Sequence, residues 1–143
     1  MTQNCMKHLS HSEQETKKLA AEFAGGLVGG EVVFLSGDLG SGKTTFVRGV
    51  AESLGFHEPV RSPSFTLVNR YSVSHGDIKQ ILHVDFYRIN DPAEIAPLAL
   101  EEETGRADTV TFIEWPESVP TPFTPTHTIS FVAAPGSHTI TIE

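Results

Sequence analysis

Apolar residues recur at helical spacing in two stretches of the chain. The first stretch follows Ser12 and Glu15, which match the capping box that often opens a helix, and a glycine pair at residues 25–26 interrupts it. The second stretch ends before Gly55, a residue suited to the left-handed position beyond a helix end. The apolar members are Leu19, Ala20, Phe23, Ala24 and Leu27 in the first stretch, and Phe46, Val47, Val50, Ala51 and Leu54 in the second. We therefore expect two amphipathic helices.

Short runs rich in β-branched and aromatic residues predict strands elsewhere in the chain. The expected strands lie at residues 31–36, 64–71, 80–87, 109–115, 128–132 and 139–142. The last two flank Pro135-Gly136 and predict a terminal hairpin. The polar residues 72–79 predict a loop, and residues 92–103 have a helical pattern despite Pro97. Residues 1–12 form a polar leader without an apolar core of the length that a signal peptide needs.

One glycine-rich segment carries a specific chemical signal. Residues 37–44 read GDLGSGKT and satisfy the P-loop pattern G-x-x-x-x-G-K-[ST], with a predicted strand before it and a predicted helix after it. In this motif backbone N–H groups surround phosphate oxygens, the lysine reaches the β and γ phosphates, and the hydroxyl binds Mg²⁺. The expected nucleotide contacts are Asp38, Leu39, Gly40, Ser41, Gly42, Lys43, Thr44 and Thr45. The sequence thus predicts a site for a purine nucleoside triphosphate with Mg²⁺.

Two acidic residues near the ends of predicted strands are candidates to serve the cation. Asp85 and Glu114 each follow an apolar run, and Mg²⁺ is usually held by one or two carboxylates together with phosphates and water. For either residue alone, a solvated acid at a strand end is an equally good interpretation. The hydroxyls of Ser62, Ser64 and Thr66 fit either a mobile loop with a hydroxyl that binds Mg²⁺ or a proline turn leading into a strand.

Composition narrows the classes of protein to which the chain can belong. Its 143 residues predict one domain over residues 1–143, and the single cysteine and the lack of a signal-peptide or membrane-length apolar run predict a cytoplasmic protein without membrane contact. The net charge of -8 disfavours direct nucleic-acid binding by this chain. A small localised phosphate site remains compatible with that charge.

Four motifs together carry a resemblance to a known family. The segments at residues 37–46, 62–67, 83–88 and 113–117, which read GDLGSGKTTF, SPSFTL, HVDFYR and IEWPE, resemble the TsaE (YjeE) family in order and spacing. The resemblance covers essentially the whole chain. It implies that the protein is an ATPase, that it uses ATP with Mg²⁺, and that it is needed to make N6-threonylcarbamoyladenosine in tRNA. It also implies TsaD and TsaB as partners that carry the transfer chemistry, so that tRNA is met only indirectly.

The resemblance also implies roles for individual residues. Lys43 would contact phosphates, Thr44 and Glu114 would serve Mg²⁺, and Asp85 would be the Walker-B-like acid near the attacking water and the cation. Catalysis would therefore rest on Lys43, Asp85 and Glu114. Residues 62–66 would form the first switch.

The resemblance also implies which residues surround the nucleotide. Thr16 would lie near the adenine, and Trp115 would neighbour the metal-binding acid. The chain departs from the family's pattern in two places: Ser64 stands where a threonine is usual, and the arginine of the last hairpin is replaced around Ser137 and His138. Ser64 keeps the hydroxyl, whereas the missing arginine removes a contact to the nucleotide.

The expected fold is an α/β three-layer P-loop NTPase domain with a mainly parallel sheet and an antiparallel C-terminal hairpin. Hydrolysis should be slow in the isolated chain, because no arginine-rich lid is visible in the sequence. Two other functions remain open from the residues alone. One is a small-molecule P-loop kinase, and the other is a nucleotide-gated binding module in which hydrolysis is incidental.

Overall fold

A computed structural model describes residues 5–38, 40–58, 60, 67–118 and 123–143. The strands are β1 (Met6–Ser10), β2 (Val32–Gly37), β3 (Val68–His75), β4 (Ile78–Asp85), β5 (Thr109–Glu114), β6 (His127–Ala134) and β7 (Ser137–Ile142). The α-helices are α1 (Glu13–Ala24) and α2 (Lys43–Ser53). Four short 3-10 helices, η1 (Pro92–Glu94), η2 (Ala96–Leu98), η3 (Leu100–Glu102) and η4 (Pro116–Ser118), complete the described elements.

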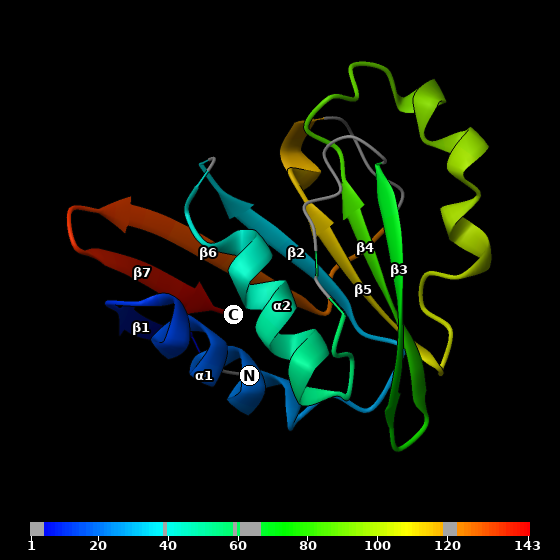
Figure 1. Ribbon diagram of the computed structural model, residues 1–143. Coiled ribbons are helices and arrows are strands. Elements are labelled where there is room, and N and C mark those ends of the chain that lie inside the picture. Colours follow the sequence, from blue (N-terminus) through cyan, green and yellow to red (C-terminus); the bar gives the residue numbers. More distant parts are fainter. Residues whose placement is uncertain (1–4, 39, 59, 61–66, 119–122) are drawn as a thin grey trace.

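The described strands form one seven-stranded sheet in the order β1-β7-β6-β2-β5-β4-β3 (Figure 1). The four central strands, β6, β2, β5 and β4, run parallel, while β6–β7, β1–β7 and β3–β4 are antiparallel pairs. This topology confirms the predicted parallel core and the antiparallel C-terminal hairpin. It also places β2, which leads into the P-loop, in the middle of the sheet between β5 and β6.

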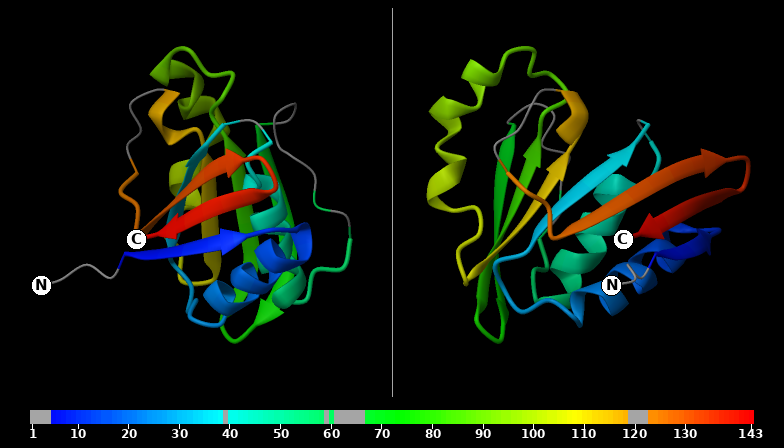
Figure 2. Two further views of the ribbon diagram at one scale, coloured as in Figure 1. Left: turned by 90° about the vertical axis from the view of Figure 1, so that its left-hand side faces the viewer. Right: turned by 180° about the vertical axis from the view of Figure 1, so that it is seen from behind.

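Each face of the sheet carries its own apolar core. The helices α1 and α2 cover one face, and the segment that holds η1 to η3 lies against the other (Figures 1 and 2). On the helical side, Phe46 and Val50 of α2 pack with Phe112 and Ile129 of the sheet. On the opposite side, Ile95 and Leu100 pack with sheet residues such as Leu82. The expected three-layer arrangement is therefore confirmed.

Helix α1 begins with the predicted cap and packs tightly on α2. The Oγ of Ser12 accepts a hydrogen bond from the Glu15 N–H at 3.1 Å, and the Glu15 carboxylate accepts one from the His11 N–H at 2.9 Å. At the crossing, a Cβ added to Gly49 would lie 2.8 Å from the Cβ of Ala20. The two backbones therefore approach closely, which brings the first turn of α1 towards the P-loop.

Two predictions about the elements were wrong, and one strand was missed. Residues 6–10 form β1, which the sequence pattern did not indicate. Most of residues 72–79, predicted as a loop, belong to the β3–β4 hairpin, whose ends are largely exposed strand. Residues 92–103 form 3-10 turns instead of one helix. Pro97 has no N–H to donate, and Ala99 has a left-handed φ of 53°, which interrupts a helix. The expected strand at 64–71 begins partly outside the described residues.

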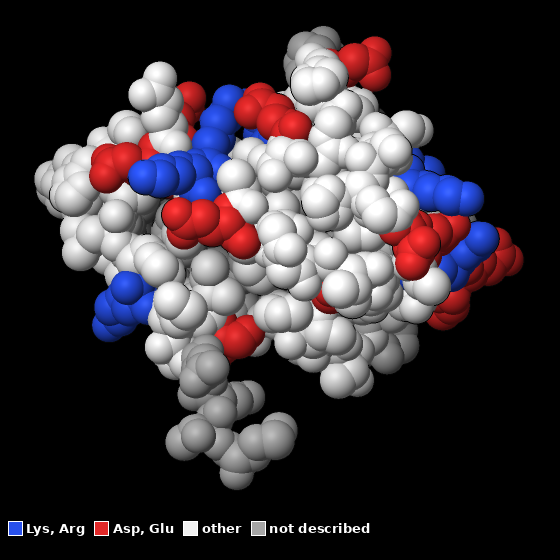
Figure 3. All heavy atoms as spheres, turned by 90° about the horizontal axis from the view of Figure 1, so that it is seen from below, with Lys and Arg blue, Asp and Glu red and all other residues white. Residues whose placement is uncertain are grey.

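Charged side chains do not form a continuous basic face on the side of the molecule seen in Figure 3. Lysines and arginines there lie among aspartates and glutamates, in keeping with the net charge of -8. Among the described residues, no helix combines the length and the apolar character that a membrane crossing requires.

Candidate functional site

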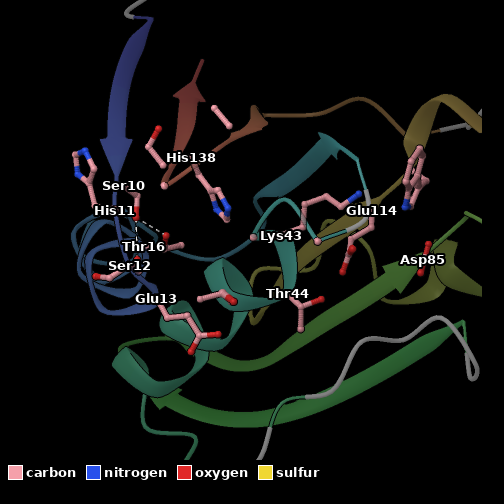
Figure 4. Close-up of a pocket in the computed structure, with 17 residues that line it drawn as sticks. Ser10, His11, Ser12, Glu13, Thr16, Lys43, Thr44, Asp85, Glu114 and His138 are labelled. Carbon is pink, nitrogen blue, oxygen red and sulfur yellow. Dashed lines mark hydrogen bonds between the residues drawn. The ribbon is translucent and has the colours of Figure 1, made fainter.

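One cavity of about 580 Å³ joins the P-loop to the N-terminal segment and the last hairpin. In Figure 4 the N-terminal residues line one side, Asp85 and Glu114 line the other, and Lys43 and Thr44 lie between them. The hairpin contributes His138 and its neighbours. Residues far apart in the sequence therefore meet at the carboxyl ends of the parallel strands, where ligands of open α/β sheets usually bind.

The P-loop is built by close contacts that only glycine permits. Gly37 ends β2 with a φ of 152°, and a Cβ there would lie 2.6 Å from the carbonyl oxygen of Phe131 on β6. Gly42 precedes α2 with a left-handed φ of 106° and has no side chain to cap the helix. The first N–H groups of α2 thus have no side-chain cap at Gly42 and lie at the positive end of the helix dipole. This arrangement suits an anion in the cavity.

Lys43 is held within the site by two contacts. Its Nζ donates to the carbonyl oxygen of Gly37 and lies 4.0 Å from the centroid of the Trp115 ring. The side chain is buried, and desolvation lowers the pKa of Lys43 below the ordinary value of 10.5, against the opposing influence of Glu114 and Asp85. A cationic group is therefore available for an anionic ligand but is poorly solvated without one.

Asp85 and Glu114 are brought together by strand register. They are paired residues at the carboxyl ends of the neighbouring parallel strands β4 and β5, and both are almost fully buried. Asp85 Oδ1 accepts from the Tyr87 N–H at 2.8 Å, and Glu114 Oε2 contacts His83 Nε2 at 2.5 Å. The two predicted acids thus occupy the same wall of the cavity.

The donor set suits a hard cation only with help from a ligand. Thr44, Asp85 and Glu114 supply a hydroxyl and carboxylate oxygens to one cavity, the ligand type that Mg²⁺ prefers. Among the described residues, no group of three His, Cys, Asp or Glu side chains could hold a metal ion by itself. Mg²⁺ in this cavity would therefore keep water or phosphate oxygens in its coordination shell, as it usually does.

The far end of the cavity consists of hydroxyl groups around the start of α1. Ser10 Oγ donates to the carbonyl oxygen of Ser12 at 2.9 Å and lies 2.6 Å from Thr16 Oγ1. Ser10 is also the register partner of His138 on β7, and a Cβ on Gly42 would lie 3.1 Å from His138 Nδ1. Pairing of β1 with β7 therefore brings the beginning of the chain, the last hairpin and the P-loop to one place.

The structure brings most of the predicted site residues to the cavity. Those that line it are Thr16, Gly40, Gly42, Lys43, Thr44, Thr45, Asp85, Glu114 and Trp115. Ser41 is fully buried, and its hydroxyl has no hydrogen-bond partner in the described part of the chain. Asp38 is exposed and does not line the cavity, while Leu39 and Ser64 lie outside the described residues.

Sequence reasoning missed several residues that line the cavity. These are Ser10, His11, Ser12, Glu13, Ala134, Gly136, Ser137 and His138. Ser12 was recognised only as a helix cap, and His138 only as the place of a missing arginine. Their shared location follows from the pairing of β1 with β7, which no motif in the sequence indicates.

Comparison with known proteins agrees with this architecture. A family model described as threonylcarbamoyl adenosine biosynthesis protein TsaE matches residues 10–139, far more than half of the chain. The crystal structure of Bacillus subtilis YdiB superposes with a TM-score of 0.75 at 30% sequence identity, covering 97% of this chain and 84% of that one. The fold and the sequence therefore point to the same relatives.

Curated relatives from several bacteria are named tRNA threonylcarbamoyladenosine biosynthesis protein TsaE. The one from Rickettsia bellii (strain RML369-C) is 40% identical over 117 residues, which cover 78% of each chain. The one from Bacillus subtilis (strain 168) is 36% identical over 110 residues, or 77% of this chain and 66% of the relative. The match to Aquifex aeolicus (strain VF5) is 50% identical over 82 residues and spans 59% of that relative's length. With the family model and these relatives in agreement, the chain belongs to the TsaE family of tRNA threonylcarbamoyladenosine biosynthesis.

Proposed function

We propose that this chain binds ATP with Mg²⁺ in the cavity and hydrolyses it to support threonylcarbamoylation of adenosine in tRNA. The observation that carries this function is the meeting of Lys43 and Thr44 at the start of α2 with Asp85 and Glu114 on the opposite wall. TsaD and TsaB are the proposed partners, and tRNA is met only through their complex. The family assignment supports the pathway, and the cavity supports the nucleotide.

The triphosphate would lie over the amino end of α2. Backbone N–H groups from Gly40 to Thr45 and the helix dipole favour negative charge there, and Lys43 supplies a full positive charge. To reach the phosphates, Lys43 would leave the Gly37 carbonyl and the Trp115 ring. The ribose and base would extend towards Thr16 and His138, which line the other end of the same cavity.

Hydrolysis would use charge neutralisation and a positioned water. Mg²⁺ held by Thr44 and Glu114, with Asp85 beside them, would neutralise phosphate charge when bound. Asp85 would also accept a hydrogen bond from the attacking water and so orient it for in-line attack. Lys43 is the only lysine or arginine that lines the cavity in the described part of the chain, so no second such cation is there to stabilise the transition state. We therefore expect slow turnover by the chain alone and a higher rate when a partner supplies such a group.

The test is steady-state ATP hydrolysis by the purified chain with Mg²⁺, alone and with TsaD and TsaB. Lys43→Ala serves as the blank, because it removes the phosphate-binding cation. The expected result is a low rate alone, a higher rate with both partners and release of free phosphate. A wild-type rate equal to the blank in both conditions, with ATP still bound, would instead assign a nucleotide-gated binding module.

A second measurement separates the ATPase from that module. Glu114→Ala and Asp85→Ala should still associate with TsaD and TsaB but should fail to support repeated rounds of tRNA modification. If these variants support multiple turnovers at the wild-type rate, hydrolysis is incidental to the function. Transfer of phosphate to a small molecule instead of water would identify a kinase.

A further inference from the structure

A buried hydrogen-bonded chain lies directly behind Glu114. The imidazole of His83 is fully buried on β4, with Nε2 at 2.5 Å from Glu114 Oε2 and Nδ1 at 3.1 Å from the hydroxyl oxygen of Tyr71. The three residues come from the adjacent strands β3, β4 and β5. Neither His83 nor Tyr71 lines the cavity. They reach the site only through the carboxylate of Glu114.

With a neutral imidazole, the chemistry of the three groups fixes the direction of the hydrogen bonds. A carboxylate only accepts, so the contact with Glu114 requires the hydrogen of His83 on Nε2. A neutral imidazole then accepts at Nδ1, and Tyr71 must donate its hydroxyl hydrogen there. Asn69 Nδ2 in turn lies 3.5 Å from the Tyr71 hydroxyl oxygen and is oriented to donate to it. In this series of hydrogen bonds, each donor thus faces an acceptor.

The hydrogen-bonded series of Tyr71, His83 and Glu114 restricts the carboxylate that faces the cavity. A glutamate has three side-chain torsions, and holding them in one arrangement costs entropy that a contact must offset. The bond to His83 engages Oε2, while Oε1 has no hydrogen-bond partner among the described residues. Glu114 therefore presents one oxygen to the cavity from a fixed position, as a ligating carboxylate supported by an outer hydrogen bond does.

We propose that His83 is a positioning residue that holds Glu114 for its role in the nucleotide site, and that Tyr71 fixes the imidazole tautomer that makes this possible. The proposal rests on the function proposed above, because it gives Glu114 a task in the cavity. It adds a residue that touches neither nucleotide nor cation. Its effect should therefore appear in the rate of the chemical step and not in recognition of the base.

The first test compares variants at position 83 at saturating Mg²⁺. His83→Leu keeps an apolar side chain in the buried space but removes the donor, and kcat for ATP should fall about 10- to 100-fold, the usual cost of losing such an outer hydrogen bond. The KM for ATP should change less than about threefold, because the lost interaction matters mainly in the transition state. His83→Gln can still donate an amide N–H to Glu114 and should recover a large part of kcat.

A second readout requires neither nucleotide nor metal. In protein labelled with ¹⁵N at histidine, the His83 signals should show hydrogen on Nε2 and none on Nδ1. Tyr71→Phe removes the donor to Nδ1 and should produce a mixture of the two tautomers, with a fall in kcat of a few fold. Signals showing hydrogen on Nδ1 in the unmodified chain would overturn the proposal.

Thr111→Val is the matched control, because Thr111 lies on the same strand as Glu114 and its buried hydroxyl has no partner in the described part of the chain. It should leave kcat and the imidazole signals unchanged. A folded His83→Leu variant with wild-type kcat would overturn the proposal while leaving the ATPase function intact. If His83→Leu does not fold, His83→Gln and Tyr71→Phe decide by the same criteria. If the unmodified protein lacks ATPase activity, the function proposed above fails. The imidazole signals then still test the hydrogen bonds that join Tyr71, His83 and Glu114.

Discussion

The ammonium nitrogen of Lys43 lies 4.0 Å from the centroid of the Trp115 ring, so the P-loop lysine rests on an aromatic face. Trp115 follows β5 with a left-handed φ of 57°, and its ring is 4.9 Å from that of Tyr87. A cation over an indole ring gains about 0.5–2 kcal/mol. A phosphate group must compete with this contact, and binding should therefore change the environment of the tryptophan.

The first prediction uses that tryptophan as a reporter. Trp115 is the one tryptophan of the chain, and ATP with Mg²⁺ should change its fluorescence as Lys43 moves from the ring to the phosphates. Titration of the unmodified protein gives the affinity directly. Lys43→Met should show no response at the same ATP concentrations. Equal fluorescence changes in both proteins would show that the tryptophan signal does not depend on Lys43.

The second prediction concerns stability without ligand. The lowered pKa of Lys43 shows that desolvation of its ammonium group outweighs the attraction of Glu114 and Asp85, whereas a methionine of similar length buries only apolar atoms. Lys43→Met should therefore raise the free energy of unfolding by about 1 kcal/mol while it removes ATP binding, a common exchange of function for stability. Thermal and urea denaturation measure the difference. Lys17→Met, which removes an exposed contact with Glu52, should not stabilise the protein.

The third prediction is a pH dependence of ATP affinity. Burial lowers the pKa of Lys43 below 10.5, and only the protonated form attracts phosphate. As pH rises through this lowered pKa, the free protein loses the cation, so affinity should fall at a pH below that expected of an exposed lysine. Lys43→Arg stays charged throughout and should give a flat profile over the same range. Parallel profiles would show that another group controls binding.

The fourth prediction tests how closely α1 and α2 must approach. In Gly49→Ala the new Cβ would lie 2.8 Å from the Cβ of Ala20 and 2.9 Å from the Cα of Lys17, so the helices must move apart. We expect a loss of about 1–3 kcal/mol in unfolding free energy, typical of overpacking. ATP affinity should also fall, because α1 carries Thr16. Denaturation and the Trp115 titration measure the two effects.

The control for that variant is Gly25→Ala. Gly25 has a helical φ of -61°, and its added Cβ would lie 3.4 Å from the nearest atom outside its own residue and neighbours. Alanine there should leave ATP affinity unchanged and stabilise the protein slightly, by about 0.5 kcal/mol, since it restricts the unfolded chain. A Gly49→Ala protein as stable as this control would contradict the tight crossing.

The sequence predicts the P-loop half of the molecule well, for a physical reason. Strand β2, the glycine turn and α2 carry strong local signals, since each is buried or conformationally restricted by neighbouring residues in the chain. The acids Asp85 and Glu114 were also found, because each ends a predicted strand that is largely buried. Their pairing in register could only be expected from the family resemblance and was seen in the structure.

The elements that sequence reasoning missed are held by distant partners. Strand β1 has mostly exposed side chains and exists because its backbone pairs with β7, so it shows no apolar alternation. The hydroxyl-lined end of the cavity follows from this pairing and was invisible for the same reason. Behind Glu114, the contacts of His83 join three strands, and no spacing along the chain reveals them.

Strand order in this sheet also determines when a growing polypeptide can first complete the cavity that we propose for the nucleotide. During synthesis, β2 and the P-loop emerge long before β6, the strand against which Gly37 is packed. Strand β1 can pair only later still, because the partner of Met6 is Ile142. A ribosome-bound chain that has not yet released residues 127–142 therefore lacks one wall of the cavity. Long-range pairing of this kind is slow to form. Completion of the cavity is thus a late event in folding, and unfinished or C-terminally truncated chains should fail to bind the nucleotide that we propose for it.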